Sequence, residues 1–462
     1  MASRITAAPH DDRPTFQEAA ADLVNAPSTA ASSTTTRWFL ILGAFVVLGV
    51  VGFILKIADD GMDDRRAWGY YVAMVSFLLT TAGGAPMLSI APVLAKANWV
   101  RPVMRISQLF SSIGVLTAIM SIPLIFLLPP LVEDEVRRRS IWFGSPAYFP
   151  HIWDTIAIFG LVFLGLALLW SSSLPDLAAI RENGSGRRKR WARRLAPGFI
   201  GTSGQWKALR IRIGVLSAFY FLFLIFTHVL FASDYIHALV PGYKDAIFPM
   251  YHALTSLQAG TASVVLATYF LWRYGGFNRY IGINQIWNLA KLQFALSLLW
   301  FYFFFSAFIV FWYSRTPQNE KVIELFDQGP HLWAFLGALF FCFIIPMWTL
   351  MWNFIRVSMR GPAILAGVII FGTLLDRVRL GVGAWAAEGI NDKFLAVVPE
   401  TVWPDLWDIF MFLGMFAGAA FLFLLVTRLL PAVSLWEIQQ SRLISKPAMY
   451  MRSEVEIVGK PD

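Results

Sequence analysis

Residues 362–385 read PAILAGVIIFGTLLDRVRLGVGAW, an apolar stretch that carries three charged side chains, Asp376, Arg377 and Arg379. About 20 apolar residues suffice for a helix to cross the hydrocarbon core of a bilayer. An ionisable group at that depth costs roughly 2.5–3.5 kcal/mol on insertion scales, so it is retained where it pairs, lines a wet cavity or handles protons. The stretch therefore predicts a membrane-spanning helix in a protein that handles charge or protons inside the bilayer.

The composition of the whole chain agrees with this prediction. Of the 462 residues, 57% are hydrophobic and 15% are charged, whereas soluble domains contain about 45–50% apolar and about 25% charged residues. The formal net charge of +9 is typical of a membrane protein with basic cytoplasmic loops. The composition indicates an all-α polytopic membrane protein and argues against the binding of nucleic acid.

Ten apolar runs are long enough to span a membrane. They cover residues 38–57, 67–94, 103–128, 152–172, 209–232, 248–272, 286–313, 331–355, 362–385 and 405–427. We expect a disordered cytoplasmic tail at 1–37, a transmembrane domain at 38–430 and a cytoplasmic C-terminal tail at 431–462. An even number of spans places both termini on one side. Most Lys and Arg residues fall on that side, which predicts that both termini are cytoplasmic.

Titratable side chains gather near the opposite, non-cytoplasmic face. They are His151, Asp154, His228, Asp234, His237, His252, His331, Asp405 and Asp408. Two chemistries use such groups. Oxidation of a quinol releases two protons, which a His or a carboxylate within hydrogen-bond reach can accept. Proton translocation needs a series of titratable groups across the membrane, and Asp376 and Lys291 are the best inner members of such a series.

Structural interpretations of the same residues stay open. Asp405 follows a proline at a helix start and is suited to capping that helix. Lys291 can extend to the cytoplasmic interface, and Asp376 can form an ion pair with Arg377 or Arg379. His228 and His252 lie on consecutive segments near one face, where a haem would need two facing ligands. The single cysteine, Cys342, excludes an iron–sulfur ligand set. We expect no metal or haem bound by this chain.

Several stretches resemble the NrfD/PsrC family of integral membrane subunits, and most closely the membrane subunits of alternative complex III. The main ones are NLAKLQFALSLLWFY at 288–302 and FWYSRTPQNE at 311–320. Shorter ones are IWD at 152–154, LPD at 174–176, SDY at 233–235, VPGY at 240–243, IFP at 247–249, and NWVR at 98–101 followed by Arg105. The resemblance spans residues 67–430 and rests on the order and spacing of these motifs.

The resemblance implies two four-helix bundles with flanking helices, in a bacterial inner membrane. It implies a quinone, menaquinone or ubiquinone, near the non-cytoplasmic face. The residues expected at that site are Asp154, Asp234 and His151 as catalytic groups, with His237 and His252 as further contacts. Proton conduction is expected at Lys291, Asp376, Arg377 and Arg379. The implied partners are an iron–sulfur or molybdopterin-like subunit, haem-c cytochrome subunits, a paralogous membrane subunit and lipids.

One departure keeps alternatives open. Quinone-binding members carry a His-x-Gly-Arg-Pro-like stretch before the fourth segment, and residues 131–145 contain none. The chain then fits either a quinone-interacting subunit without its own redox metal or a scaffold or proton-conducting paralogue in the same complex. A secondary transporter is a third interpretation, for which the interruption at Gly83 and Gly84 is the only sign.

Overall fold

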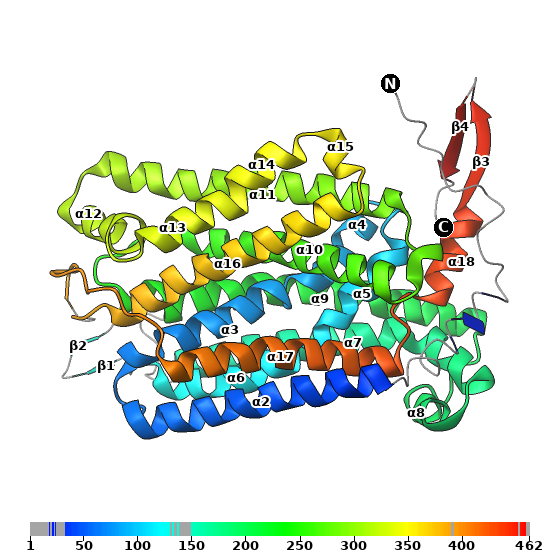
Figure 1. Cartoon of the computed structure of the whole chain (residues 1–462), viewed down its shortest axis with the longest axis horizontal. Coiled ribbons are helices and arrows are strands. Elements are labelled where there is room, and N and C mark those ends of the chain that lie inside the picture. Colours follow the sequence, from blue (N-terminus) through cyan, green and yellow to red (C-terminus); the bar gives the residue numbers. More distant parts are fainter. Residues whose placement is uncertain are drawn as a thin grey trace.

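The computed structural model describes residues 18, 21–22, 24, 33–129, 132–133, 136–137, 149–389, 392–450 and 453–458. Most of the predicted tail at 1–37 therefore lies outside the described residues. Within the described part, nine helices are long and apolar enough to cross a membrane. Helix α16 (Arg360–Ala386), which carries the three charged residues, runs beside them as the tenth (Figure 1). The expected all-α polytopic membrane protein is confirmed.

The long helices follow the predicted segments closely. They are α2 (Ser33–Asp60), α3 (Gly69–Thr81), α5 (Arg101–Leu109) with α6 (Gly114–Leu127), α7 (Phe149–Asn183), α9 (Ser203–Tyr235), α10 (Phe248–Tyr274), α11 (Ile283–Ser314), α13 (Leu332–Leu339) with α14 (Ile345–Leu350), α16 and α17 (Leu406–Leu429). Shorter helices are α4 (Ala91–Leu94), α8 (Gly186–Leu195), α12 (Pro317–Ile323), α15 (Asn353–Arg356) and α18 (Leu435–Ile444). Two hairpins, β1–β2 (Val132–Glu133, Val136–Arg137) and β3–β4 (Ser445–Tyr450, Ser453–Val458), lie outside the helical body.

The helices form two groups of four with one flanking pair. The first bundle contains α3, α5–α6, α7 and α9, and the second contains α10, α11, α13–α14 and α16. The first helix of each bundle packs against the last helix of the other, α3 on α16 and α10 on α9. Helices α2 and α17 pack along each other beside the first bundle (Figure 1). Their exposed apolar residues, such as Leu40 and Val47 on α2, suit a surface that faces lipid.

The helix that begins with α3 is interrupted in the middle of the membrane domain. It ends at Thr81 and resumes as the 3-10 helix η3 (Ala85–Ser89) and then α4. At the break the backbone of Gly84 lies against α10, because a Cβ on Gly84 would collide with the carbonyl oxygen of Ser256. A Cβ on Gly260 would likewise collide with Gly84. Glycine at both positions lets the two bundles approach closely at this crossing.

Candidate functional site

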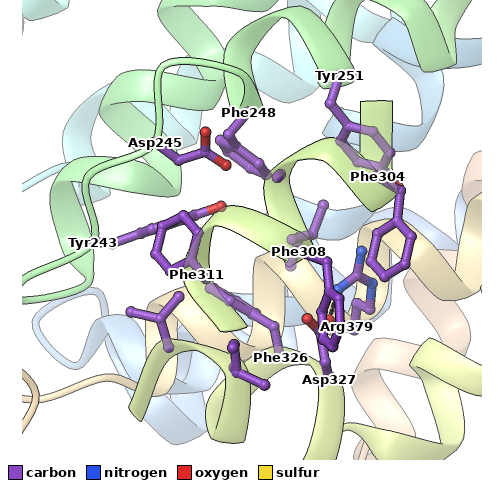
Figure 2. A pocket seen from close by; sticks show the side chains of 14 residues that line it. Tyr243, Asp245, Phe248, Tyr251, Phe304, Phe308, Phe311, Phe326, Asp327 and Arg379 are labelled. Carbon is purple, nitrogen blue, oxygen red and sulfur yellow. Dashed lines mark hydrogen bonds and ion pairs between the residues drawn. The ribbon is translucent and has the colours of Figure 1, made fainter. Parts of the chain in front are cut away.

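A pocket lined mainly by aromatic side chains opens at one end of the second bundle. Its walls come from the loop after η5 (His237–Leu239), the start of α10, the end of α11, α12 and α16. The rings are Tyr243, Phe248, Tyr251, Phe304, Phe308, Phe311 and Phe326, and the charged side chains are Asp245, Asp327 and Arg379 (Figure 2). The cavity volume is about 60 Å³. We call it the aromatic pocket.

The charged side of the aromatic pocket is an ion pair between two elements. Asp327 lies in a π-helical turn (Glu324–Gln328) that follows α12, a local distortion that often occurs at functional sites. Its Oδ1 atom lies 2.7 Å from Nη1 of Arg379 on α16. Burial raises the pKa of Asp327 to about 6, against the lowering effect of Arg379. Burial also raises the pKa of Asp245. The carboxyl of Asp327 is therefore suited to accept and release protons near neutral pH.

Arg379 connects the aromatic pocket to a fully buried cluster on α16. Its Nη2 and Nε atoms lie 2.9 Å and 3.0 Å from Oδ1 of Asp376. The hydroxyl of Tyr251 donates to the same Asp376 oxygen at 2.9 Å. Nη2 of Arg377 lies 3.1 Å from Oδ2 of Asp376, without the alignment of a hydrogen bond. Two acids and two guanidinium groups thus neutralise one another along a path that begins at the pocket.

Arg377 is the least satisfied member of this cluster. Its side chain has no exposed surface, and none of its three guanidinium nitrogens has a hydrogen-bond partner among the described residues. A buried donor without a partner costs about 1–3 kcal/mol, and more when it is charged. Such groups are commonly met by buried water. The interior around Arg377 is therefore suited to hold water between charged groups.

A second group of buried polar residues connects α10 with the first bundle. His252 on α10 and His228 on α9 face each other with their Nδ1 atoms 2.8 Å apart. The other ring nitrogen of His252 lies 3.0 Å from Oγ of Ser76 on α3. All three side chains are buried. Tyr251 of the first group and His252 of the second group are neighbours in sequence on the first turns of α10. We call the buried residues of both groups the buried polar chain; they are Asp376, Arg377, Arg379, Tyr251, His252, His228 and Ser76.

The residues predicted from the sequence fall in several places. Asp154 on α7 and Asp234 on α9 are buried in the first bundle and do not line the aromatic pocket. His237 lies beside that pocket, where its Nε2 accepts from the Asp245 N–H and its ring centroid lies 4.4 Å from that of Tyr243. The side chain of His151 lies outside the described residues.

Lys291 lies apart from the other predicted proton-path residues. It is exposed on α11, and its Nζ lies 3.5 Å from the centroid of the Trp287 ring. By contrast, Asp376, Arg377 and Arg379 come together as described above. Asp405, as expected from the sequence, caps α17 by accepting from the Asp408 N–H at 2.7 Å, and it also pairs with Lys56 of α2 at 2.6 Å.

Sequence reasoning missed Asp327, Tyr251, Tyr243 and Asp245. Asp327 lies between two apolar segments, where acidic residues are common and give no signal. Tyr251 precedes His252 directly, so its neighbour could have drawn attention to it. Sequence reasoning also missed another buried ion pair, near the other end of the molecule. There Arg105 of α5 lies 2.8 Å from Asp176 of α7. Only the packing of the helices brings these side chains into contact.

The ion pair between Arg105 and Asp176 lies beside further polar contacts with the C-terminal segment. Asp176 accepts from the hydroxyl of Ser434 at 2.8 Å and from the Leu435 N–H at 3.0 Å. Glu437 of α18 pairs with Arg101 at 2.7 Å, and burial raises the pKa of Glu437 to about 7. Helix α18 therefore closes this end of the first bundle.

No protein-family model and no curated protein matches this sequence.

Proposed function

We propose that this chain is a quinone-interacting integral membrane subunit of a multi-subunit oxidoreductase, as its resemblance to the NrfD/PsrC family implies. In this proposal a quinol ring enters the aromatic pocket, where Asp327 accepts the proton of one hydroxyl group and Asp245, the other carboxylate that lines the pocket, accepts the proton of the second. Oxidation of the quinol releases two protons and two electrons. The electrons pass to a metal centre of a partner subunit, which belongs to an iron–sulfur or haem-c protein. The membrane is a bacterial inner membrane, with both termini in the cytoplasm.

The proposal rests on one observation, the continuity between the aromatic pocket and the buried polar chain. Apolar rings suit the ring and tail of a quinone, since ligand pockets are mainly apolar with a few placed polar groups. The carboxyl of Asp327, with its pKa near 6, is suited to general base catalysis. Hydrogen bonds connect Asp327 with Arg379 and Arg379 with Asp376, which gives a proton a route from the pocket to the buried Asp376.

The decisive experiment compares two carboxylates in the intact complex. Quinol-dependent reduction of the electron acceptor is measured for Asp327→Asn and for Asp154→Asn, the acid favoured by the sequence. We expect Asp327→Asn to lower turnover by about 10²–10⁴-fold, the usual contribution of a general base. Glu324→Gln is the matched control, because Glu324 lies in the same turn, is 46% exposed and pairs with Lys321.

The two variants separate the two sites. Loss of turnover in Asp154→Asn with normal turnover in Asp327→Asn would overturn the aromatic pocket and support a site in the first bundle. Normal turnover in both variants would remove quinol oxidation from this chain.

A second candidate function is proton conduction without quinone binding. The feature that favours it is the second group of buried polar side chains, in which His252, next to Tyr251 in the sequence of α10, lies within hydrogen-bond distance of His228 and Ser76. Its test is proton uptake by proteoliposomes that contain the purified complex. Uptake that is lost in Asp376→Asn, together with normal quinol turnover in Asp327→Asn, would support this function instead.

A further inference from the structure

A second pocket lies at the opposite end of the molecule from the aromatic pocket. It has a volume of about 230 Å³ and lies between α7, α9 and the loop that joins α8 to α9. Leu174 and Leu209 form part of its apolar wall, and among the residues that the structure describes Arg212 is the only charged one that lines it. We call it the loop pocket.

The wall of the loop pocket is built by side chains that bind the backbone of residues 195–199. Nε1 of Trp170 donates to the Leu195 carbonyl at 3.0 Å. Arg181 donates to the carbonyls of residues 196, 197 and 199, and Gln205 donates to the carbonyl of residue 198 at 2.6 Å. Five consecutive carbonyl oxygens are thereby occupied. The loop is held in shape, and these acceptors are not left to bind a cation or a donor.

Gln205 fixes the next part of the loop as well. Its Oε1 atom accepts from the backbone N–H groups of Ile200 and Gly201 at 2.9 Å and 3.0 Å. The long helix α9 then begins with a capping box formed by Thr202 and Gln205. A loop whose groups are satisfied at both ends needs little rearrangement to receive a ligand.

Exposed basic residues are concentrated on the two helices next to the loop pocket. The exposed basic residues on α8 and at the start of α9 are Arg187, Arg190, Arg193, Arg194, Lys207, Arg210 and Arg212. The guanidinium of Arg212 lies 5.7 Å from the centroid of the Trp170 ring. No carboxylate lies within ion-pair distance of Arg212 in the part of the chain that the structure describes. The ligand that this charge favours is an anion.

An exposed apolar stripe continues from Arg212 along α9. Val215, Phe219 and Leu222 follow at helical spacing and are 50–59% exposed; residues three and four apart lie on one helix face. On α7, Phe163 is 69% exposed, seven residues before Trp170. One anionic group at the depth of Arg212 with an apolar chain along these residues is the arrangement of a phospholipid.

From this geometry we infer that the loop pocket binds one anionic phospholipid, with its phosphate on Arg212 and its acyl chains along α7 and α9. Basic pockets between transmembrane helices are recognised binding places for anionic headgroups. The acyl chains would cover the exposed apolar side chains of α7 and α9 named above. This inference concerns a site distinct from the aromatic pocket and holds whether or not the chain oxidises quinol.

The test uses the purified full chain or its intact complex, freed of lipid in detergent. Binding of phosphatidylglycerol is counted by native mass spectrometry, with phosphatidylcholine of the same acyl chains as the zwitterionic comparison. Ala208→Phe fills the loop pocket without changing charge, because Ala208 lines it. Ala295→Phe is its matched control, the same substitution at an exposed position on α11, away from the pocket and from the apolar stripe of α9.

We expect Ala208→Phe to abolish the tight phosphatidylglycerol site and Ala295→Phe to leave it intact. Arg212→Ala should weaken binding by about tenfold or more, the range of a hydrogen bond to a charged group. Arg212→Lys should retain most of the binding. Arg210→Ala should lower it by about fivefold at most, the contribution of one surface charge.

Four outcomes would overturn the proposal. Equal binding of the two lipids would remove the selection for an anion. Normal binding in Ala208→Phe would show that the basic surface attracts lipid without using the pocket. Displacement of the lipid by millimolar inorganic phosphate would indicate a site for a free anion. Loss of a partner subunit in Arg212→Ala at unchanged lipid content would assign the surface to an acidic protein.

Discussion

At the scale of single residues, the second bundle balances its buried charges. Asp327 and Asp376 oppose Arg377 and Arg379, and Arg379 contacts both acids. Removing charges from water is costly, and their mutual attraction repays that cost only when further hydrogen bonds complete the geometry. Tyr251 supplies one such hydrogen bond to Asp376. Arg379 is therefore the residue on which the balance depends.

Replacing Arg379 by Met should destabilise the protein by about 3–5 kcal/mol, because two acids are left with one misaligned guanidinium. The free energy of unfolding is measured by denaturant titration in detergent. Arg66→Met is the control, since Arg66 forms an exposed pair with Glu388 and such pairs contribute about 0–1 kcal/mol. The double variant Arg379→Met with Asp327→Asn should recover part of the loss. Strictly additive losses in the double variant would contradict this account.

Quinol turnover should depend on pH through Asp327. Burial raises the pKa of its carboxyl to about 6, and only the deprotonated form accepts a proton. Turnover should therefore rise as the pH increases from 5 to 7 and level off above that range. The rising limb should persist in Glu324→Gln and vanish in Asp327→Asn. A rising limb that Asp327→Asn leaves in place would assign it to another group.

At the scale of the elements, the crossing of the interrupted helix over α10 holds the two bundles together. Gly84 and Gly260 meet backbone to backbone there. Because the helix is interrupted between α3 and η3, Gly84 lies outside a regular helical turn. The crossing brings Ser76 of α3 within reach of His252 on α10, so the contact between bundles also assembles the buried polar chain.

Gly260→Ala should destabilise the protein by about 1–3 kcal/mol, the usual cost of overpacking, because its Cβ has no room beside Gly84. Gly367→Ala on α16 is the matched control, since nothing lies within 4 Å of a Cβ there. That control should stabilise by about 0.5–1 kcal/mol through helix propensity. Thermal unfolding of both purified variants provides the comparison. Equal stability of the two variants would refute the close crossing.

At the scale of the whole molecule, the two ends of the membrane domain differ in charge and chemistry. Helices α8 and α18 lie at one end, and α12 lies at the other (Figure 1). Residues of α12 line the aromatic pocket. The basic residues of α8 and of early α9 are concentrated at the first end. Because Lys and Arg concentrate on the cytoplasmic side of membrane proteins, this asymmetry predicts how the protein is oriented in the membrane.

The bias predicts that α8 and the C-terminus face the cytoplasm and that α12 faces the opposite side. Reporter fusions measure this directly: a reporter active only outside the cytoplasm should be active after residue 62 and inactive after residues 186 and 440. Fluorescent-protein fusions at the same positions serve as the control with the reverse pattern. Activity of the first reporter after residue 186 would contradict the assigned orientation.

Much of the fold follows from local features of the sequence. Ten apolar runs are visible without any contact information, and the helices of the structure match them. The Gly83–Gly84 pair indicated an interruption, and the helix breaks there. The charged residues of α16 were recognised because they are exceptional at that depth. The predicted roles of Asp154, Asp234 and His151 stay predictions.

The sequence by itself determined the class of protein, the positions of the spanning segments and the presence of charge inside one of them, because hydropathy and length act along the chain. The tertiary structure alone decided which charges meet. Helix rotation and crossing bring Arg379 to Asp327, fifty-two positions away, and His228 to His252. It also decided the two pockets, since their walls come from separate helices and loops. Long-range contacts depend on packing geometry, which periodicity along one helix does not encode.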